Sequence, residues 1–496
     1  MNIIVTGLAG RLKQSMNMKK ENADISPECD MPIHNLRQFI SRLETAGELS
    51  RVTVPVDPVM EIAAITDRVC KQPDGGKALL FEHPTGSHFQ VATNLFGSAT
   101  RVCQALGVVS INELTDRLRG LIDSIPVPDS RTLDRQITAL AEFSRFAPRT
   151  NVDPDHALIQ MDPPNLSSFP FLKSWPEDGA ASGYSRYITL PQVFTADPDG
   201  GTHNCGMYRV QLRGDSDVAI QWKVGSGAAR HAELYRLAGK PMPVAIALGG
   251  DPATLFSAMF PLPGDLDELT FAGFLRGTAL VTSPCQSVPL LVPTGAEMII
   301  EGYIDPGDTV TEGQFGNHSG LYSPAAPASL MRVTAVSHRP DAIIPATVVG
   351  PPPMEDCWMA LAWERLLLAF LLKLVPSVKD IHFPFEWVFH QSAVIVINNP
   401  QPGTVKAVAG QLWALPWFSS ARILLFVAAK AGIHGLPQAA WKSINVTDAS
   451  QDVYRDGISG RIAIDATDCR LQRPEVKSSA ACAELVTRRW KEYGFA

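Results

Sequence analysis

The sequence predicts a protein of mixed α+β and α/β class, with an N-terminal α+β region, a central small barrel or sandwich and a C-terminal α/β domain. The chain of 496 residues is too long for one ordinary hydrophobic core, so two or three domains are expected. Many short strand-like runs, broken by Gly, Pro and Asp, fill the segment from Tyr187 to Val336. After this segment, continuous apolar strands lie near helical stretches, which is typical of an α/β domain.

The N-terminal region follows an extension of residues 1–34, which is expected to be poorly ordered. Its basic residues come after a short apolar start, the reverse of a secretory signal. Asn35 can cap a first helix whose apolar residues follow the 3.6-residue period, and Gly47 can end it. From there to Gly120, β-branched runs alternate with helical stretches such as EIAAITDRVC. An α+β unit is therefore predicted over residues 35–120.

The rest of the chain divides at proline-rich points. Residues 121–160 are polar and rich in Pro, and are expected to form a linker or an extended wrap over the surface. The strand-rich block should contain one inserted helix near residues 228–238. Three consecutive prolines mark the next boundary, and a linker helix is predicted within residues 351–376. Residues 377–496 form the predicted α/β domain, which ends in an amphipathic helix in VTRRWKEYGFA.

Composition and charge limit the classes of function. Hydrophobic residues make up 45% of the chain and charged residues 19%, as expected for a folded globular protein. A net charge of -7 without long runs of Lys or Arg predicts no nucleic acid and no anionic membrane surface as partner, and favours a small molecule. Eight cysteines without a C-x-x-C motif indicate reduced thiols and a cytoplasmic protein. No apolar stretch approaches the roughly 20 residues of a membrane span.

Three polar clusters are candidate sites. The first is HNCGMYR, in which the side-chain oxygen of Asn204 is a hard ligand for a cation, and Arg209 is expected on the opposite side of an extended run. A polar turn that enters a strand is the structural alternative. The second is PATLFSAMFPLPGDLDELTFAG, in which Ser257, Met259 and Pro261 can present backbone groups to a phosphate or a ring. Glu268 opens a helix there, so capping is the alternative, because the helix dipole favours a carboxylate regardless of function.

The third cluster is TEGQFGNHSG, in which two glycines bring Glu312, Asn317 and His318 into one tight loop. Such loops allow close backbone approach to a ligand, and an ordinary surface turn is the alternative. The chain has no G-x-G-x-x-G after a strand, no Walker A motif, no G-x-S-x-G and no H-E-x-x-H. The common nucleotide-binding, hydrolase and metalloprotease interpretations therefore lack support.

In order and spacing, these clusters resemble the UbiD family of prenylated-flavin decarboxylases, which includes ferulic acid decarboxylase. The resemblance runs from about Asn35 to the end, through NCGMYR, ALGGDPATLFSAMFPLP, DELTFAGFLRG, LLVPTGAEMIIEGYI, EGQFGNHSG and WKEYGFA. It implies that residues 121–350 form a split β-barrel that binds prenylated flavin mononucleotide (FMN). It also implies that the C-terminal α/β domain acts as a lid and as the dimerisation domain.

The resemblance implies non-oxidative, reversible decarboxylation of an aromatic, heteroaromatic or α,β-unsaturated carboxylic acid through a covalent adduct with prenylated FMN. Loss of carbon dioxide from an sp2 carbon leaves a carbanion, which side chains alone cannot stabilise. With Asn317 at the position of the family's second carboxylate, the chain resembles the branch that acts on pyrrole-2-carboxylate-like acids, and the amide could hydrogen-bond a ring heteroatom. Phenolic, furan, indole and acrylic acids stay open. Two alternatives stay open: a polyprenyl-hydroxybenzoate decarboxylase of ubiquinone synthesis and a non-catalytic flavin-binding protein.

The resemblance also implies a metal site. In the family an Asn, a His and a Glu hold Mn2+ that bridges to the flavin phosphate, with K+ nearby. Asn204 and Glu268 match the first and last of these ligands. The family's His falls near Gly225 in this chain, so His231 is predicted to replace it. The residues expected to bind the cofactor are Asn204, Met207, Tyr208, Arg209, Ser257, Met259, Pro261 and Glu268.

The catalytic set implied by the family is an Arg between two carboxylates. Arg209 matches the Arg and is expected to orient the substrate carboxylate by a bidentate contact. Glu312 matches the first carboxylate and is expected to assist protonation. Asn317 stands where the second carboxylate usually sits, and an amide donates no titratable proton at neutral pH. The expected partners are the carboxylic acid, a prenyl-flavin synthase that supplies the cofactor and a second copy in a homodimer.

Overall fold

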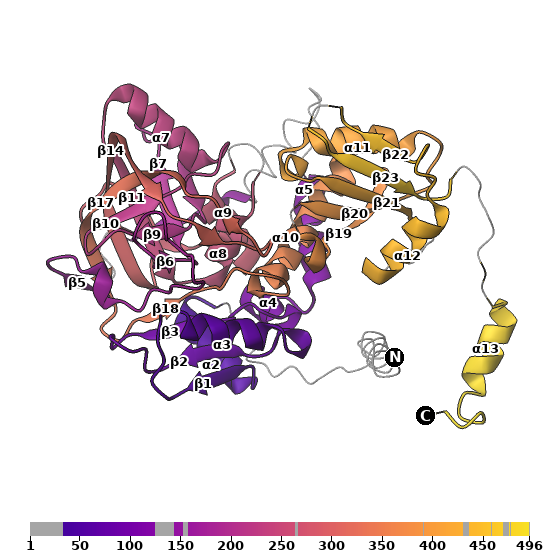
Figure 1. The fold of residues 1–496 in the computed structure, drawn as a ribbon, viewed down its shortest axis with the longest axis horizontal. Helices are drawn as coiled ribbons and strands as arrows, with labels where there is room; N and C mark the ends of the chain where they lie inside the picture. Colours follow the sequence, from indigo (N-terminus) through magenta and orange to yellow (C-terminus); the bar gives the residue numbers. More distant parts are fainter. Residues whose placement is uncertain are drawn as a thin grey trace. The chain divides into compact units, whose positions relative to one another are not determined.

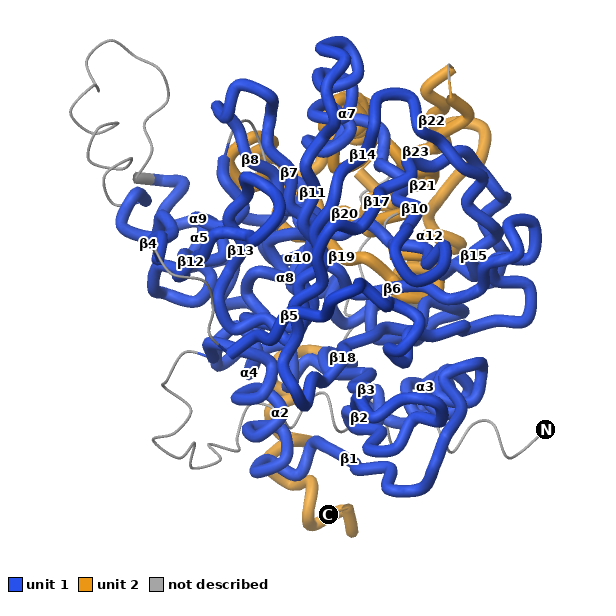
Figure 2. Tube along the Cα trace, turned by 90° about the vertical axis from the view of Figure 1, so that its left-hand side faces the viewer, with its two compact units in different colours: residues 1–369 blue, residues 370–496 orange. Residues whose placement is uncertain are grey.

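A computed structural model describes residues 33–124, 143–151, 157–262, 266–389, 391–429, 436–457, 459–469, 476 and 478–495. Almost all of the predicted N-terminal extension, together with segments 125–142 and 152–156 of the predicted linker, lies outside the described residues. The chain divides into two compact units between Ala369 and Phe370 (Figure 2). The division falls inside helix α10 (Glu355–Leu374), which is the predicted linker helix.

The N-terminal region of unit 1 has both helices and a sheet, as predicted (Figure 1). Its sheet has the order β1-β2-β3-β18, with β1 (Leu49–Val52), β2 (Ala78–Phe81), β3 (Gln90–Thr93) and β18 (Ile343–Pro345). Its helices are α2 (Leu36–Thr45), α3 (Glu61–Cys70), α4 (Ala99–Leu106), α5 (Ile111–Ser124) and the short η2 (Pro73–Gly75). The Asn35 side chain accepts a hydrogen bond from the backbone N–H of Gln38 at 2.9 Å, which is the predicted cap.

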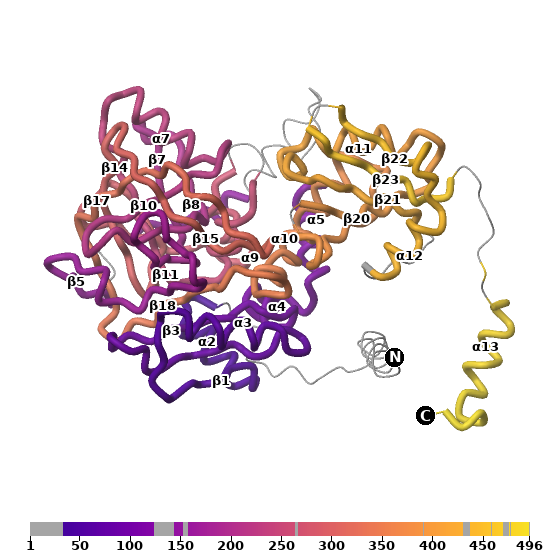
Figure 3. The backbone as a smooth tube through the Cα atoms, in the orientation of Figure 1, coloured from indigo at the N-terminus to yellow at the C-terminus, as the bar shows by residue number. Residues whose placement is uncertain are grey.

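Helix α3 covers one face of this sheet, as can be followed in Figure 3. Its buried Ile62 and Ala63 pack in one apolar cluster with Leu79 and Phe81 of β2. Strand β18 pairs in parallel with β3, although about 250 residues of sequence separate them. The N-terminal sheet is therefore completed by a segment that the local pattern could not assign to it.

The first turn of α10 places Glu355 in the interior of unit 1. Its side chain is buried and accepts a hydrogen bond from the backbone N–H of Phe96 at 2.8 Å. Burial raises the pKa of this carboxyl from its ordinary 4.5 to about 7. The folded protein therefore binds this proton more tightly than the unfolded chain does. The resulting stabilisation is complete below pH 4.5 and is lost as the pH rises through about 7.

Glu355→Gln should remove this pH dependence while it keeps an acceptor for Phe96. From the shift of the pKa, the free energy of unfolding of the parent should fall by about 3 kcal/mol between low pH and a pH above 7. Urea unfolding of the cofactor-free proteins at pH 5 and pH 8 should show the variant gaining roughly that free energy of unfolding relative to the parent. An equal difference between variant and parent at the two pH values would contradict the assignment.

The central part of unit 1 is a nine-stranded antiparallel sheet of order β6-β9-β10-β17-β14-β11-β7-β8, with β5 paired to β17. The strands are β5 (Ile159–Met161), β6 (Tyr187–Ile188), β7 (Gln192–Ala196), β8 (His203–Gly206), β9 (Val210–Leu212), β10 (Asp217–Ile220), β11 (Met242–Gly249), β14 (Ala296–Glu312) and β17 (Ala326–His338). The predicted strand-rich block is confirmed. So is the inserted helix, α7 (Gly227–Ala238), which Ser226 caps.

Two strands that lie at or next to opposite ends of this sheet are joined by a very short segment. Strands β9 and β8 stand six positions apart along the pairing order, yet only Met207–Arg209 connect them. In a flat sheet they would be about 29 Å apart, whereas the connecting chain can span about 14 Å at most. The sheet must therefore curl until its ends approach each other. We call Met207–Arg209 the seam; the split barrel itself stays a prediction, because strand pairing defines order and not closure.

Two helices pack beside the seam, and smaller elements complete the central part of unit 1. Helices α8 (Pro252–Met259) and α9 (Glu268–Arg276) pack together and contact β8. The other elements are η3 (Leu166–Ser168), a sheet of β4 (Arg149–Thr150), β12 (Val281–Pro284) and β13 (Leu291–Pro293), and a hairpin of β15 (Phe315–Gly316) and β16 (Tyr322–Ser323). The backbone N–H of Met207 donates to the carbonyl of Ala258 at 3.1 Å. This bond ties the seam to α8.

Unit 2 is an α/β domain, as predicted. Its sheet has the order β19-β20-β21-β23-β22, in which β20, β21 and β23 are parallel and the two edge strands are antiparallel. The strands are β19 (Val378–His382), β20 (Ser392–Ile397), β21 (Ile423–Ala428), β22 (Val453–Arg455) and β23 (Ile462–Ala466). The helices are α11 (Thr404–Ala414), α12 (Leu436–Val446), η4 (Phe385–Trp387) and η5 (Pro416–Phe418). Val394 of β20 and Leu425 of β21 are buried against Ala439 of α12.

The C-terminal helix differs from the prediction. It is α13 (Ala480–Arg488), whereas the predicted helix continued to the end of the chain. Trp490 stacks on Phe495 with ring centroids 4.7 Å apart, and Gly494 has a positive φ of 84°. The chain therefore folds back in turns after the helix. No helix in the described part of the chain is long and apolar enough to cross a membrane, and the seven cysteines in that part are free thiols.

Candidate functional site

The seam brings the first two sequence clusters together. Asn204 lies in β8, and the backbone N–H of the next residue, Cys205, donates to Oε2 of Glu268 at 3.2 Å. The hydroxyl of Ser257, at the end of α8, donates to the backbone carbonyl of Glu268 at 2.5 Å. Asn204 and Glu268 therefore lie close to each other, although they are far apart in sequence.

Glu268 does not cap its helix. The side chain of Asp267 takes that role and accepts a hydrogen bond from the backbone N–H of Thr270 at 2.7 Å. Burial raises the pKa of the Glu268 carboxyl to about 7. An ionised carboxylate in such surroundings is stabilised by a cation close to it. The geometry therefore favours a ligand-binding role for Glu268 over the capping alternative.

Asn204 has an unsatisfied polar atom. Its side chain is buried, and its Nδ2 makes no hydrogen bond to a residue that the structure describes. A Cβ added at Gly227, the first residue of α7, would lie only 2.4 Å from Oδ1 of Asn204. The resemblance put the family's histidine near Gly225, but the residue of this segment that meets Asn204 is Gly227. No side chain fits there unless Asn204 moves.

His231 has other partners. Its Nδ1 lies 2.9 Å from the hydroxyl of Thr195 and its Nε2 lies 3.1 Å from the hydroxyl of Thr202. Burial lowers the pKa of this histidine to about 4, so the ring is neutral at physiological pH. Both nitrogens are already bonded, and the prediction that His231 is a metal ligand has no support in this geometry. Within the described residues, no group of three or more His, Cys, Asp or Glu side chains is arranged to hold a metal.

Arg209 and Glu312 form a two-pronged ion pair. Nε of Arg209 donates to Oε1 of Glu312 at 2.7 Å, and Nη2 donates to Oε2 at 2.8 Å. Glu312 is the last residue of β14 and is 1% exposed, whereas the arginine side chain is 22% exposed. The guanidinium lies over the ring of Phe315 at 5.2 Å from its centroid. The pair is therefore buried on the glutamate side and open on the arginine side.

Gln221 is a contact of Arg209 that the sequence did not indicate. Nη2 of Arg209 also donates to Oε1 of Gln221 at 2.8 Å. Strands β9 and β10 pair in antiparallel register, with Ile220 opposite Val210. The next pair in that register is Gln221 opposite Arg209, so the two side chains point to the same face. Only the register reveals this neighbour, and the local sequence pattern does not define it.

Asn317 is bonded elsewhere. Its Nδ2 donates to the hydroxyl of Ser323 at 2.9 Å, and its Oδ1 accepts from the backbone N–H of His318 at 2.8 Å. Nδ1 of His318 lies 2.8 Å from Oδ2 of Asp356. Among the residues that the structure describes, the hydrogen-bond partners of Arg209 are Glu312 and Gln221. The structure therefore does not bring Asn317 to Arg209.

The loop after Glu312 is held by the protein itself. The phenol of Tyr187 donates to the carbonyls of Gly313 and Gln314 at 3.2 and 3.1 Å. The backbone N–H of Gly316 donates to Oδ1 of buried Asp178 at 2.9 Å. A Cβ at Gly316 would lie 2.1 Å from Cδ1 of Trp175. The close approach that glycine permits here is to an indole ring of the protein, whereas we expected a ligand.

The other predicted cofactor residues lie on or beside the seam. Tyr208 is buried, and its ring meets Trp222 edge-on with centroids 5.3 Å apart. Burial raises the pKa of the Tyr208 phenol. Ser257 is buried, Met259 is half-buried at the end of α8, and Pro261 is exposed just beyond it. The bond from Met207 to α8 brings this segment next to the seam.

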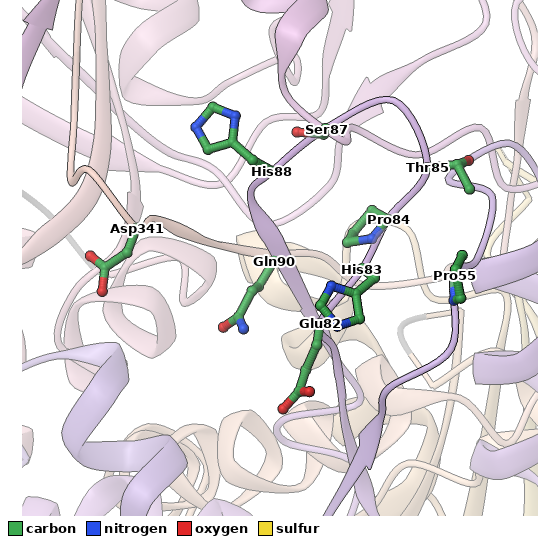
Figure 4. Close-up of a pocket in the computed structure, with 9 residues that line it drawn as sticks. All are labelled: Pro55, Glu82, His83, Pro84, Thr85, Ser87, His88, Gln90 and Asp341. Carbon is green, nitrogen blue, oxygen red and sulfur yellow. The ribbon is translucent and has the colours of Figure 1, made fainter.

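A hollow of about 530 Å3 lies elsewhere in unit 1 and shares no residue with the predicted site (Figure 4). Both of its carboxylates are paired with an arginine, because Glu82 accepts from Arg51 at 2.7 Å and Asp341 accepts from Arg37 at 2.8 Å. The residues that line it are Pro55, Glu82, His83, Pro84, Thr85, Ser87, His88, Gln90 and Asp341.

Three family descriptions match successive parts of the chain. The 3-octaprenyl-4-hydroxybenzoate carboxy-lyase N-terminal domain matches residues 40–118, the Rift-related domain matches residues 149–352 and the C-terminal domain matches residues 357–477. These three domains define UbiD. The chain belongs to the UbiD family of prenylated-FMN-dependent decarboxylases. The matches also show the three-domain architecture of UbiD for this chain.

Relatives of this UbiD chain span nearly its whole length. An uncharacterized protein of Archaeoglobus fulgidus is 36% identical over 88% of this chain and 92% of its own. One of Aquifex aeolicus is 35% identical over 87% of this chain and 91% of its own. The structure of an evolved dimeric form of the UbiD-class enzyme HmfF from Pelotomaculum thermopropionicum, in complex with prenylated FMN, is 28% identical. It aligns with a TM-score of 0.75 over 91% of this UbiD chain and 100% of that chain.

The UbiD fold is shared more widely. Vanillic acid decarboxylase of Sedimentibacter hydroxybenzoicus, in its closed form, aligns with a TM-score of 0.78 at 24% identity. The alignment covers 92% of this UbiD chain and 98% of that chain. At this identity the likeness concerns the fold alone.

Proposed function

We propose that this UbiD-family enzyme uses prenylated FMN to remove carbon dioxide from an aromatic or heteroaromatic carboxylic acid, by a non-oxidative and reversible reaction. The observation that carries the proposal is the pairing of two sites along the seam. At one end Asn204, which is buried, and Glu268, which is half-buried, offer oxygen donors, and at the other end Arg209 and Glu312 form a preorganised ion pair. The first suits the phosphate end of a cofactor with its cation, and the second suits a substrate acid.

The residues at the seam fit a metal that bridges to a phosphate. An amide oxygen and a carboxylate are hard donors, which Mn2+ and similar divalent ions accept, and such ions commonly complete their coordination with phosphate oxygens and water. Asn204 has an unsatisfied buried polar atom, and the carboxylate of Glu268 accepts a hydrogen bond from the backbone N–H of Cys205. Two protein ligands, without a histidine, would hold the metal, and K+ is proposed beside it.

Arg209 is the proposed binding group for the substrate carboxylate. Its Nε and Nη2 are already bonded to Glu312. The bidentate contact that the sequence predicted for the substrate carboxylate is therefore made with Glu312. The two N–H groups of Nη1 remain for the substrate. They fix the carboxylate so that the bond to be broken has one orientation. When bound, prenylated FMN supplies the electron sink that carbon–carbon cleavage requires.

Glu312 is the proposed proton carrier. The carbon that loses carbon dioxide must gain a proton, and the group that supplies it must lie within hydrogen-bond reach of the reacting atoms. Glu312 is the carboxyl group bonded to Arg209, and it is buried away from bulk water. Asn317, whose amide is bonded to Ser323, cannot take this role.

The substrate class, the assembly and the source of the cofactor complete the proposal. The preference for a pyrrole-2-carboxylate-like acid depends on the Asn317 amide. In this structure that amide is bonded to Ser323, so the preference gains no support. HmfF, at 28% identity, has an evolved dimeric form, and we propose a homodimer for this chain as well. A prenyl-flavin synthase is the proposed source of the cofactor.

A panel of acids tests the proposal. The protein is produced together with a prenyl-flavin synthase, and release of carbon dioxide is measured on pyrrole, furan, indole, phenolic and acrylic acids and on a polyprenylated hydroxybenzoate. Turnover of an aromatic or heteroaromatic acid is expected from the cofactor-loaded protein and none from protein made without the synthase. A protein that carries the cofactor but acts on no acid would support the non-catalytic alternative, and turnover of the polyprenylated acid alone would support the ubiquinone pathway.

A further inference from the structure

We infer that Gln221 is the neutral second partner of Arg209, and that it positions the guanidinium and keeps the site electrically neutral so that the substrate binds as a carboxylate anion. This inference rests on the proposed function. Nothing in the sequence clusters indicated this residue, and the family resemblance pointed to Asn317 for the second partner. The contact of 2.8 Å between Nη2 of Arg209 and Oε1 of Gln221 is the observation that starts the argument.

The donors of Arg209 can be accounted for one by one. A guanidinium has five N–H groups, one on Nε and two on each Nη. Glu312 accepts from Nε and from one N–H of Nη2, and Gln221 accepts from Nη2 as well. Within the described residues Nη1 makes no hydrogen bond, and the arginine side chain is 22% exposed. Gln221 and Glu312 together therefore fix the plane of the guanidinium and leave one edge for the substrate.

Backbone register holds Gln221 in this place. It follows β10 directly, one residue after the last pair with β9, in a register where Val218 lies opposite Leu212 and Ile220 opposite Val210. The next residue, Trp222, is anchored by its indole N–H, which donates to the hydroxyl of Ser329 at 3.1 Å. The Gln221 side chain therefore enters the site from the end of β10, one residue beyond the last pair of the sheet and directly before an anchored tryptophan.

The amide of Gln221 determines the charge of the site. Arg209 and Glu312 sum to zero, and Gln221 adds no charge. A carboxylate at position 221 could accept the same hydrogen bond, but it would place a second negative charge beside the arginine. A substrate anion would then approach a site of net negative charge, and like charges repel strongly in a partly buried setting.

Gln221→Glu tests this inference, because it keeps the acceptor oxygen and adds only the charge. The probe is the acid of the panel that the parent turns over fastest, and its neutral primary amide serves as a competitive inhibitor. For the cofactor-loaded variant at pH 8, we expect KM for the acid to rise about tenfold or more. The Ki of the neutral amide should stay within about twofold, since an uncharged ligand does not meet the repulsion.

Two further variants separate charge from shape. Gln221→Met has a similar size without the acceptor, and should lower kcat through a less fixed arginine while it raises KM by less than about threefold. Gln160→Glu adds the same charge at an exposed position of β5 in the same sheet, and should change neither constant. Equal KM for parent and Gln221→Glu, or equal increases in Gln221→Glu and Gln221→Met, would overturn the inference alone. A parent that turns over no acid would instead refute the proposed function.

Discussion

Arg209→Ala is expected to lower kcat/KM for the substrate acid by about a thousandfold or more, because it removes the group that binds and orients the carboxylate. Glu312 is 1% exposed and pairs with this arginine through two hydrogen bonds, so the alanine variant leaves it without its partner. Such a loss costs about 3 to 5 kcal/mol of stability unless the carboxyl becomes protonated. The measurement is steady-state release of carbon dioxide, with thermal unfolding monitored in parallel.

A second variant keeps the test of Arg209 valid if the alanine variant folds poorly. Arg209→Lys retains the positive charge beside Glu312 but loses the planar fork that matches a carboxylate. It should fold and still lose activity about a hundredfold. Arg236→Ala is the matched control, since Arg236 is an exposed arginine of α7 paired only with Glu233 on the surface, and its activity should equal that of the parent. Parent-like turnover by Arg209→Lys and Arg209→Ala would remove Arg209 from the mechanism.

Glu268→Gln and Asn204→Ala are expected to lose most of the bound flavin and metal. Both residues are proposed to hold the cation that ties the flavin phosphate to the seam, and Gln offers no negative charge to a divalent ion. After gel filtration of protein made with the prenyl-flavin synthase, flavin absorbance and manganese content per chain should both fall about tenfold or more. Glu233→Gln, which changes an exposed carboxylate of α7, is the control and should retain both.

The stability of the cofactor-free protein separates this loss from misfolding. Burial raises the pKa of Glu268 to about 7, so at pH 8 the folded protein without a cation contains an unfavourable buried charge. Glu268→Gln removes that charge, and its melting temperature without cofactor at pH 8 should equal or exceed that of the parent. Unchanged flavin and manganese in Glu268→Gln would show that the cofactor is held without this carboxylate.

The sequence predicted the fold well where local patterns decide it. Asn35 caps the first helix, the inserted helix lies at Gly227–Ala238, and the apolar runs of unit 2 form its parallel strands. These features follow from side-chain periodicity and capping, which act over a few residues. The prediction for the C-terminal helix was wrong about where the helix ends. The stacking of Trp490 on Phe495 and the turn at Gly494 involve residues more than one helical turn apart, which side-chain periodicity does not capture.

The site was predictable only in part. The resemblance named Asn204, Glu268, Arg209 and Glu312, and the structure joins the first two through Cys205 and the last two directly. It could not supply Gln221, because that neighbour depends on the register between two strands. The chain departs from the family at two positions: Asn317 stands where the second carboxylate usually sits, and His231 is the predicted substitute for the family's histidine. In the structure the ring nitrogens of His231 are bonded to the hydroxyls of two threonines, and the amide of Asn317 is bonded to Ser323.

The most direct test of the central claim is a crystal structure of the protein produced together with a prenyl-flavin synthase. The account predicts one flavin along the seam, with its phosphate and a cation at Asn204 and Glu268 and its ring system facing Arg209 and Glu312. A flavin bound in another hollow, or these two pairs of side chains facing separate cavities, would contradict it.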